Sequence, residues 1–163
     1  MGEECSVFSP GEDLVVEISY VAQKRIEKPI LAIGVIGANG PCFTSNMLLD
    51  GRQPAWIEGE GKIRCRFRSI PLLPQNFSIR MRVQAEEGRE TIISYQDVAY
   101  FSVAGDLADY GYQGEFWRWV RNSTPVVVPY EWTLPDGRTA AVSLTQGSGA
   151  AGSALSRGRT LAK

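Results

Sequence analysis

Two stretches of strict alternation, joined by an apolar segment bracketed by prolines, constrain the fold more than any other feature. In residues 61–68 and 77–83, apolar residues alternate with polar ones, and the polar positions are mostly arginine. Side chains of a β-strand point to opposite faces in turn, so each stretch predicts a strand with one buried and one solvated face. The segment between them, residues 70–74, predicts a crossover between two sheets. The pattern therefore indicates an antiparallel sandwich.

Further strand patterns follow each other at short intervals along the chain. The expected strands occupy residues 13–22, 30–36, 42–48, 61–68, 77–83 and 91–103. The run at 30–36 is apolar throughout, as in a strand buried on both faces or at a dimer contact, and the last strand is expected to bend near Gln96 and Asp97. Residues 52–59 predict irregular structure. This spacing of strands and turns predicts an all-β fold, an immunoglobulin-like antiparallel β-sandwich of about 7–8 strands.

The composition argues against several functional classes. The chain has 163 residues and no histidine, so the usual general base, the usual metal ligand and every histidine-activated nucleophile are missing. A carboxylate enzyme stays open, but we expect a protein that is not an enzyme and holds no cofactor or metal. The net charge of −1 argues against nucleic-acid binding, which needs a continuous basic stripe. The three cysteines lack zinc-site spacing and, without a secretion signal, predict reduced thiols in the cytoplasm.

The sequence changes character after Gly105. Residues 106–135 are rich in aromatic residues, and within them residues 124–132 form a β-prone segment. Two prolines confine this segment to the edge of a sheet or to a partner's edge. The end of the chain is composed mainly of Gly, Ala, Ser, Arg and Lys and cannot bury a core. The sequence predicts a sandwich domain at 1–135 that includes the aromatic segment, and a flexible tail at 136–163.

Several short motifs, each common in β-sandwiches, occur here in an order that resembles a known family. In chain order they are Phe8-Ser9-Pro10-Gly11-Glu12, the alternating Leu14, Val16, Ile18 and Tyr20, Pro29-Ile30, the glycines Gly40, Gly59 and Gly61, Ile70-x-Leu72-x-Pro74-x-x-Phe77-x-Ile79, and Phe101-x-Val103. Together they resemble the C-terminal domain of Wzt-type proteins, the ATP-binding subunits of ABC transporters that export O-antigen polysaccharide. The resemblance covers about residues 5–105.

The resemblance implies a carbohydrate-binding domain that recognises the terminal structure of an O-antigen polysaccharide and so selects finished chains for export. It also implies a homodimer with an exchanged C-terminal strand, for which residues 124–132 are suited. The expected dimer contacts are Val126, Val128, Tyr130 and Trp132. The chain lacks a Gly-x-x-x-x-Gly-Lys-Ser/Thr loop, so we expect an excised domain whose parent chain carries the ATPase.

The resemblance implies two further partners and a location. The partners are the nucleotide-binding domain of the same parent chain and the membrane permease subunit of the transporter. The domain would then lie in the cytoplasm, peripheral to the inner membrane through the transporter.

Arginines on the outer surfaces are the candidate polysaccharide ligands. If residues 70–74 cross between sheets, Arg80 and Arg82 lie outside one sheet, and the arginines at 64, 66 and 68 lie outside the other. With Phe101 and Val103 facing the core, alternation places Gln96 and Tyr100 beside Arg80 and Arg82. Trp56 or Trp117 would supply an aromatic platform at the rim of this face.

Less specific interpretations of the same residues stay open. Alternating arginines commonly form a solvated face that discourages edge pairing, and the first arginine row could contact a transporter subunit. Trp117 could pack a C-terminal element onto the sandwich. A structural or protein-interaction module without a glycan ligand is therefore the alternative function.

Overall fold

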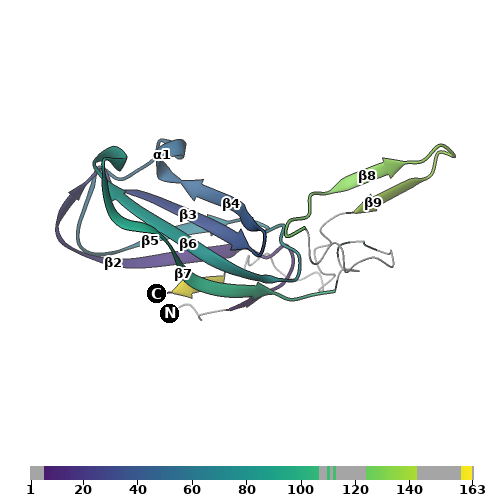
Figure 1. Cartoon of the computed structure of the whole chain (residues 1–163), viewed down its shortest axis with the longest axis horizontal. Helices are drawn as coiled ribbons and strands as arrows, with labels where there is room; N and C mark the ends of the chain where they lie inside the picture. The colour runs from purple at the N-terminus through teal and green to yellow at the C-terminus, as the bar shows by residue number, and fades with distance from the viewer. Residues whose placement is uncertain (1–5, 107–109, 111, 113–123, 143–158, 163) are drawn as a thin grey trace, which may run out of the picture.

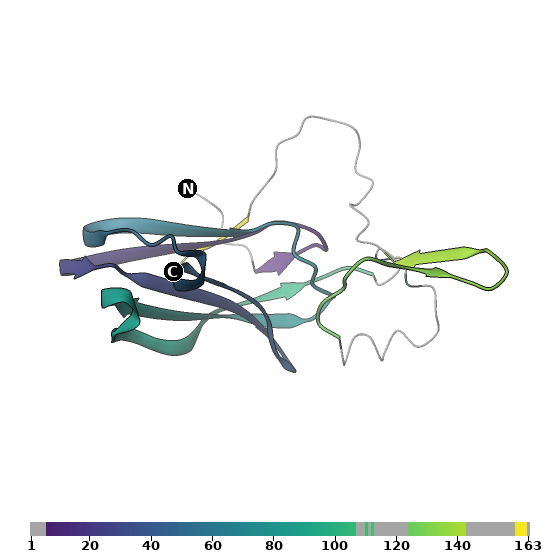
Figure 2. The ribbon, with the colours of Figure 1, turned by 90° about the horizontal axis from the view of Figure 1, so that it is seen from above.

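The chain folds into two β-sheets packed face to face, with a separate hairpin that projects from one end (Figure 1 and Figure 2). The computed structural model describes residues 6–106, 110, 112, 124–142 and 159–162. The described strands are β1 (Val7–Phe8), β2 (Leu14–Glu27), β3 (Ile30–Gly37), β4 (Gly40–Asn46), β5 (Trp56–Phe67), β6 (Asn76–Ala85), β7 (Glu90–Val103), β8 (Tyr130–Thr133), β9 (Thr139–Val142) and β10 (Arg159–Ala162). Two short helical segments are α1 (Met47–Asp50) and the 3₁₀ turn η1 (Glu86–Gly88).

The strands form a five-stranded sheet in the order β1-β7-β6-β3-β4 and a three-stranded sheet in the order β10-β2-β5. The pairs β2–β5, β3–β4, β3–β6 and β6–β7 are antiparallel, and β1 and β10 add to the sheet edges in parallel. The all-β sandwich predicted from the sequence is confirmed. The connection between β6 and β7 is the predicted turn at residues 86–89, which contains η1.

The segment between β5 and β6 crosses from one sheet to the other, as the proline-bracketed motif predicts. Ile70, Leu72 and Leu73 in this crossover are fully buried. Burial of a side chain of this size is worth about 1.5–3 kcal/mol. The backbone of the crossover is satisfied on both sides, because Ile70 N–H donates to Glu12 O at 2.9 Å and Leu73 N–H donates to Pro125 O at 3.0 Å. The crossover is therefore part of the core and not a surface loop.

The core lies between the two sheets and follows the predicted alternation. It is built from one face of β2, β3, β6 and β7 together with the crossover. Its buried members are Phe8, Leu14, Val16, Ile33, Val35, Ile70, Leu72, Phe77, Ile79, Phe101 and Val103. Strand β4 is at the edge of the five-stranded sheet and β5 is at the edge of the three-stranded sheet. The rings of Phe43 in β4 and Phe67 in β5 contact each other, with their centroids 5.1 Å apart. Sequence alternation thus places the buried face of each of these strands correctly.

Strand β3 is buried on both faces, as its uninterrupted apolar run predicts. Each residue from Ile30 to Val35 is buried. One face supplies Ile33 and Val35 to the core, and the other carries the small residues Ala32 and Gly34. Side chains from β6 and β7 cover these small residues, and they form the candidate site.

Several strand boundaries differ from the sequence-based expectation, among them the end of β2, the end of β4 and the start of β5. β4 ends at Asn46, because Asn46 caps α1 by accepting a hydrogen bond from Leu48 N–H at 2.9 Å, and Gly51 closes the turn in the left-handed conformation. β5 begins at Trp56, inside a stretch predicted to be irregular. The irregularity lies instead in the partner strand, where residues 23–25 of β2 oppose the single residue Glu58.

The β-prone segment at 124–132 divides into two parts. Its first part pairs with the crossover through a bridge between Leu72 and Val126 and a hydrogen bond from Val127 N–H to Pro71 O at 2.8 Å. Its last residues enter β8, which pairs with β9 in the projecting hairpin. The domain boundary at 135 stays a prediction, and both β9 and β10 lie beyond it.

Candidate functional site

The two arginines of β6 lie on the outer surface of the five-stranded sheet. Arg80 is opposite Gly34 and Arg82 is opposite Ala32 in the ladder between β6 and β3. Residues directly opposite each other project to the same side of an antiparallel pair, so both arginines stand beside small residues of β3. The surface formed with neighbouring side chains of β7 is called the outer face here, and its members are Arg80, Arg82, Tyr95, Asp97 and Tyr100.

Gln96 does not share this face with the arginines, contrary to the prediction. Alternation counted back from Phe101 assumed a regular strand, but β7 contains a bulge in which Val98 is the extra residue. Val98 packs against the core, and beyond it the alternation is reversed. Gln96 is therefore opposite Met81, whose side chain faces the core.

The bulge brings two other residues to the outer face. Asp97 is directly opposite Arg80 in the ladder. The next residue on the same side of β7 is Tyr95, whose ring lies between the two arginines. The ring centroid is 5.8 Å from Cζ of Arg80 and 5.9 Å from Cζ of Arg82, near the outer limit for a cation–π contact. The sequence-based site included neither residue, because a regular alternation placed Gln96, and not its two neighbours, beside the arginines.

The Tyr95 side chain crosses β6 and reaches β3. A Cβ built at Gly34 would lie 2.8 Å from the Tyr95 hydroxyl oxygen, so any other residue at this position would displace that hydroxyl group. A glycine within an otherwise apolar, β-branched strand often marks such a close approach. Gly34 was therefore the sequence signal that could have indicated an aromatic residue on this face.

Arg80 is held in place by Asp97. Its Nε donates to Oδ1 of Asp97 at 2.7 Å and its terminal nitrogen donates to Oδ2 at 3.3 Å, a two-point contact. These hydrogen bonds hold the pKa of Asp97 below its usual value and raise the pKa of Arg80. Ser78 adds a further hydrogen bond to Asp97. The positive charge of Arg80 is thus already matched within the chain.

Arg82 differs from Arg80 in having no such carboxylate among the described residues. Its Nε is buried and has no hydrogen-bond partner among the residues that the structure describes. Beside the same sheet, Tyr100 is 70% exposed and lies opposite Ser78. The outer face therefore offers one guanidinium with unused donors and one freely exposed aromatic ring.

The two predicted platform residues are not brought to this face. Trp56 begins β5 in the other sheet, where its neighbour Ile57 is buried and Trp56 itself is 46% exposed. The guanidinium carbon of Arg25 lies 4.6 Å from the centroid of its ring. Trp56 therefore faces outward on the opposite side of the sandwich. Trp117 lies outside the described residues.

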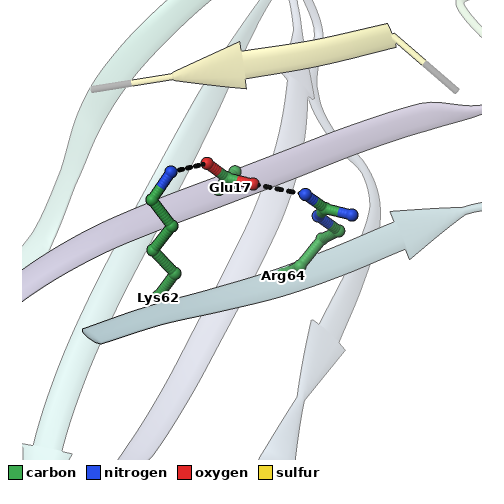
Figure 3. A network of polar contacts seen from close by, with 3 residues as sticks. All are labelled: Glu17, Lys62 and Arg64. Carbon is green, nitrogen blue, oxygen red and sulfur yellow. Dashed lines mark hydrogen bonds and ion pairs between the residues drawn. The ribbon is translucent and has the colours of Figure 1, made fainter. Parts of the chain in front are cut away.

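The arginines of β5 take part in ion pairs with β2 (Figure 3). Glu17 accepts hydrogen bonds from Lys62 at 2.7 Å and from Arg64 at 2.6 Å, and Asp13 pairs with Arg66. Hydrogen bonds from Lys62 and Arg64 lower the pKa of Glu17 to about 2. Arg64 and Arg66 thus have carboxylate partners in β2 or just before it, which favours a structural role over a binding role for these two arginines, while Arg68 lies just after β5.

A comparison with known proteins identifies the family of this chain. The sequence profile of the Wzt C-terminal domain family matches residues 1–115. The chain belongs to the Wzt C-terminal domain family. This match spans all strands of the sandwich from β1 to β7 and places the chain among domains of O-antigen export transporters, which are non-catalytic. The resemblance inferred from the ordered motifs is confirmed.

Comparisons with individual proteins add less. One solved structure similar to this Wzt C-terminal domain is described as the crystal structure of the C-terminal domain of wzt. It aligns with a TM-score of 0.46 and 11% identity, over 54% of this chain and 57% of that one. No curated protein sequence matches the chain.

The expected dimer contacts of this Wzt C-terminal domain fall into two groups. Val126 packs against the core of its own chain, since it bridges to Leu72. Val128, Tyr130 and Trp132 are exposed, and the last two rings contact each other at 6.3 Å between centroids. Only the exposed group is placed where a partner could reach it.

The described residues contain neither a candidate metal-binding cluster nor a candidate membrane-spanning helix. In the described ranges of the chain, no three His, Cys, Asp or Glu side chains are grouped so that they could hold a metal ion. Across the same residues, no helix is both long and apolar enough to cross a membrane.

Proposed function

We propose that this Wzt C-terminal domain recognises the terminal structure of an O-antigen polysaccharide without catalysis, and so selects finished chains for export. The observation that carries the proposal is the outer face, where Tyr100 is 70% exposed and where Arg82, further along the same face of β6, has a buried Nε without a hydrogen-bond partner among the described residues. Membership of the Wzt C-terminal domain family supports the polysaccharide as the ligand class.

The outer face has the two kinds of group that sugar recognition requires. An exposed tyrosine ring can stack against the apolar C–H face of a sugar, and its hydroxyl can hydrogen-bond at the edge. A guanidinium presents several donors in a planar fork that can reach two oxygens at once. Arg80, Asp97 and Tyr95 hold each other through the contacts described above and thereby fix the surroundings of Arg82. Such a prearranged surface loses little side-chain freedom on binding.

Calorimetric titration of the whole chain with the O-antigen of the strain that encodes it tests the proposal. We expect a dissociation constant in the micromolar to millimolar range, about −4 to −8 kcal/mol. Tyr100→Ala should weaken binding, while Trp56→Ala, which removes an exposed aromatic ring from the opposite sheet, should not. Binding lost with Trp56→Ala but kept with Tyr100→Ala would move the site to the three-stranded sheet, and no binding at all would refute the function.

The remaining partners belong to the same proposal. We infer a homodimer that uses the exposed side chains Val128, Tyr130 and Trp132 of the hairpin region, because adjacent exposed aromatic rings are common in interface cores. The nucleotide-binding domain of the parent chain and the permease subunit are the further partners, with the domain on the cytoplasmic side of the inner membrane. Sedimentation should show Trp132→Ser shifting the chain toward a monomer, whereas Leu49→Ser, at an exposed leucine of α1, should leave the dimer intact.

The alternative of a protein-interaction module draws its support from the same hairpin. The hairpin projects away from the sandwich (Figure 2), and its exposed aromatic side chains could also bind a protein partner other than a second copy. A chain that forms no dimer and binds no polysaccharide, but is retained by the transporter's permease, would favour this alternative.

A further inference from the structure

We propose that the outer face binds an anionic group of the polysaccharide, a carboxylate or a phosphate, on the guanidinium of Arg82. The inference rests on the proposed function, because it names the chemical class of the sugar residue held at the same face.

The first argument is a comparison among the arginines of the two sheets. Arg80 is paired with Asp97 on its own face, and on the opposite sheet Arg64 pairs with Glu17 of β2 and Arg66 with Asp13, just before β2. Arg82 has no ion pair among the residues that the structure describes, although it lies on the same strand, β6, as Arg80. Arginine is suited to carboxylates and phosphates because its fork can hold two oxygens at once. Arg82 is therefore the arginine of β6 whose fork is available to a ligand.

The second argument is the state of its Nε atom. This nitrogen is buried and has no hydrogen-bond acceptor among the described residues. A buried donor without an acceptor carries a desolvation penalty that a ligand oxygen can remove. Because Nε is covered in this conformation, an anion reaches the terminal nitrogens first. A contact that includes Nε then requires a rotation of the Arg82 side chain, which no hydrogen bond at Nε opposes.

The third argument is the charge around Arg82. The charges of Arg80 and Asp97 compensate each other, and Tyr95 and Tyr100 contribute neutral rings and hydroxyls. One positive charge is left uncompensated on the outer face. A neutral sugar would leave this charge unmatched, whereas an anionic one would pair with it next to the aromatic rings.

The test compares the native O-antigen of the encoding strain with two derivatives, one reduced at its carboxyl groups and one stripped of phosphate. Each is titrated calorimetrically against the whole chain and against Arg82→Gln. We expect one derivative to bind at least about tenfold more weakly than the native polymer, a loss of about 1.4 kcal/mol. The derivative that loses affinity identifies the anion as carboxylate or phosphate. Arg82→Gln should bind the native polymer about as weakly as the unsubstituted chain binds that derivative. The Arg82→Gln variant should also bind the native polymer and that derivative equally well.

Two further variants separate charge from geometry. Arg82→Lys keeps the charge without the fork and should recover only part of the affinity. Arg68→Gln, the same substitution as Arg82→Gln at an exposed arginine just after β5 of the other sheet, should bind normally. In the arginine Nε–H spectrum of the ¹⁵N-labelled chain, the signal lost in Arg82→Lys should shift when native polymer is added.

Each outcome decides the matter. If the native polymer binds but neither derivative is weaker, or if Arg82→Gln binds normally, the inference is overturned and the proposed function stands. If the native polymer does not bind at all, both are overturned.

Discussion

Substituting Gly34 by alanine tests whether the position of Tyr95 arranges the outer face. A Cβ at residue 34 would lie 2.8 Å from the Tyr95 hydroxyl oxygen, where ordinary contacts begin near 3.4 Å. The next atoms are Cδ1 of Ile36 at 3.5 Å and Cζ of Tyr95 at 3.8 Å, so the hydroxyl alone obstructs the methyl group. We expect Gly34→Ala to push the Tyr95 ring off β3 and away from the two guanidinium groups.

The fold should tolerate this change, because the displaced atom is the far end of a partly exposed side chain. Alanine in place of glycine within a strand stabilises by about 0.5–1 kcal/mol. Weakening the cation–π contacts of Tyr95 costs about the same at an exposed site. The two effects nearly cancel, so the free energy of unfolding should change by less than about 1 kcal/mol. Polysaccharide affinity should nevertheless fall, since Arg82 loses the ring beside it.

Tyr95→Phe supplies the matched control, because it removes the obstructing oxygen and keeps the ring. Gly34→Ala should weaken binding in the native background and have almost no effect in the Tyr95→Phe background. Urea unfolding and polymer titration of the four proteins would measure the coupling, expected to be about 1 kcal/mol in binding. An equal effect of Gly34→Ala in both backgrounds, or none in either, would refute the steric reasoning.

Three further predictions concern stability and are measured by urea unfolding. Gly61→Ala should destabilise the fold by about 1–3 kcal/mol, because a Cβ at residue 61 would lie 2.3 Å from the hydroxyl oxygen of Tyr20 and 2.4 Å from Cζ of Tyr20. In a Tyr20→Ala background, Gly61→Ala should cause little further loss of stability. The ion pairs of Glu17 lower its pKa from 4.5 to about 2, so their contribution is complete above about pH 4.5 and is lost as the pH falls toward 2; Glu17→Gln should flatten the pH dependence in this window, and an unchanged slope would contradict the assignment. Tyr110→Phe should cost about 1–3 kcal/mol, because the buried hydroxyl donates to Leu72 O at 2.6 Å, and a neutral effect would show that this carbonyl finds another donor.

The sequence predicted the sandwich well where one rule governed each residue. Alternation in β2, β6 and the end of β7 identified the buried face, because successive side chains of a regular strand point alternately to the core and to water. The prolines and buried leucines of the crossover likewise predicted a change of sheet. These features depend on neighbours within a few residues, and the sequence shows those neighbours directly.

The candidate site was predicted only in part, for a physical reason. Arg80, Arg82 and Tyr100 were placed correctly because no irregularity separates them from the core residues used for counting. Gln96 was placed wrongly because one extra residue at Val98 reverses the alternation. A bulge depends on how two strands register against each other, and a single strand does not contain that information.

The hydrogen bonds between the crossover and residues 125–127 have a consequence for where the chain can be shortened. The family match stops at residue 115, yet the backbone partners of Pro71 and Leu73 lie at residues 125–127. A chain truncated at the edge of the family match would leave the N–H of Leu73 and the carbonyl of Pro71 without these partners. It would also lose Val127 from the small cluster around Leu73. Shortened versions of this protein must therefore extend beyond residue 127 to keep these contacts of the crossover, and the pairing of β10 with β2 requires residues 159–162 as well.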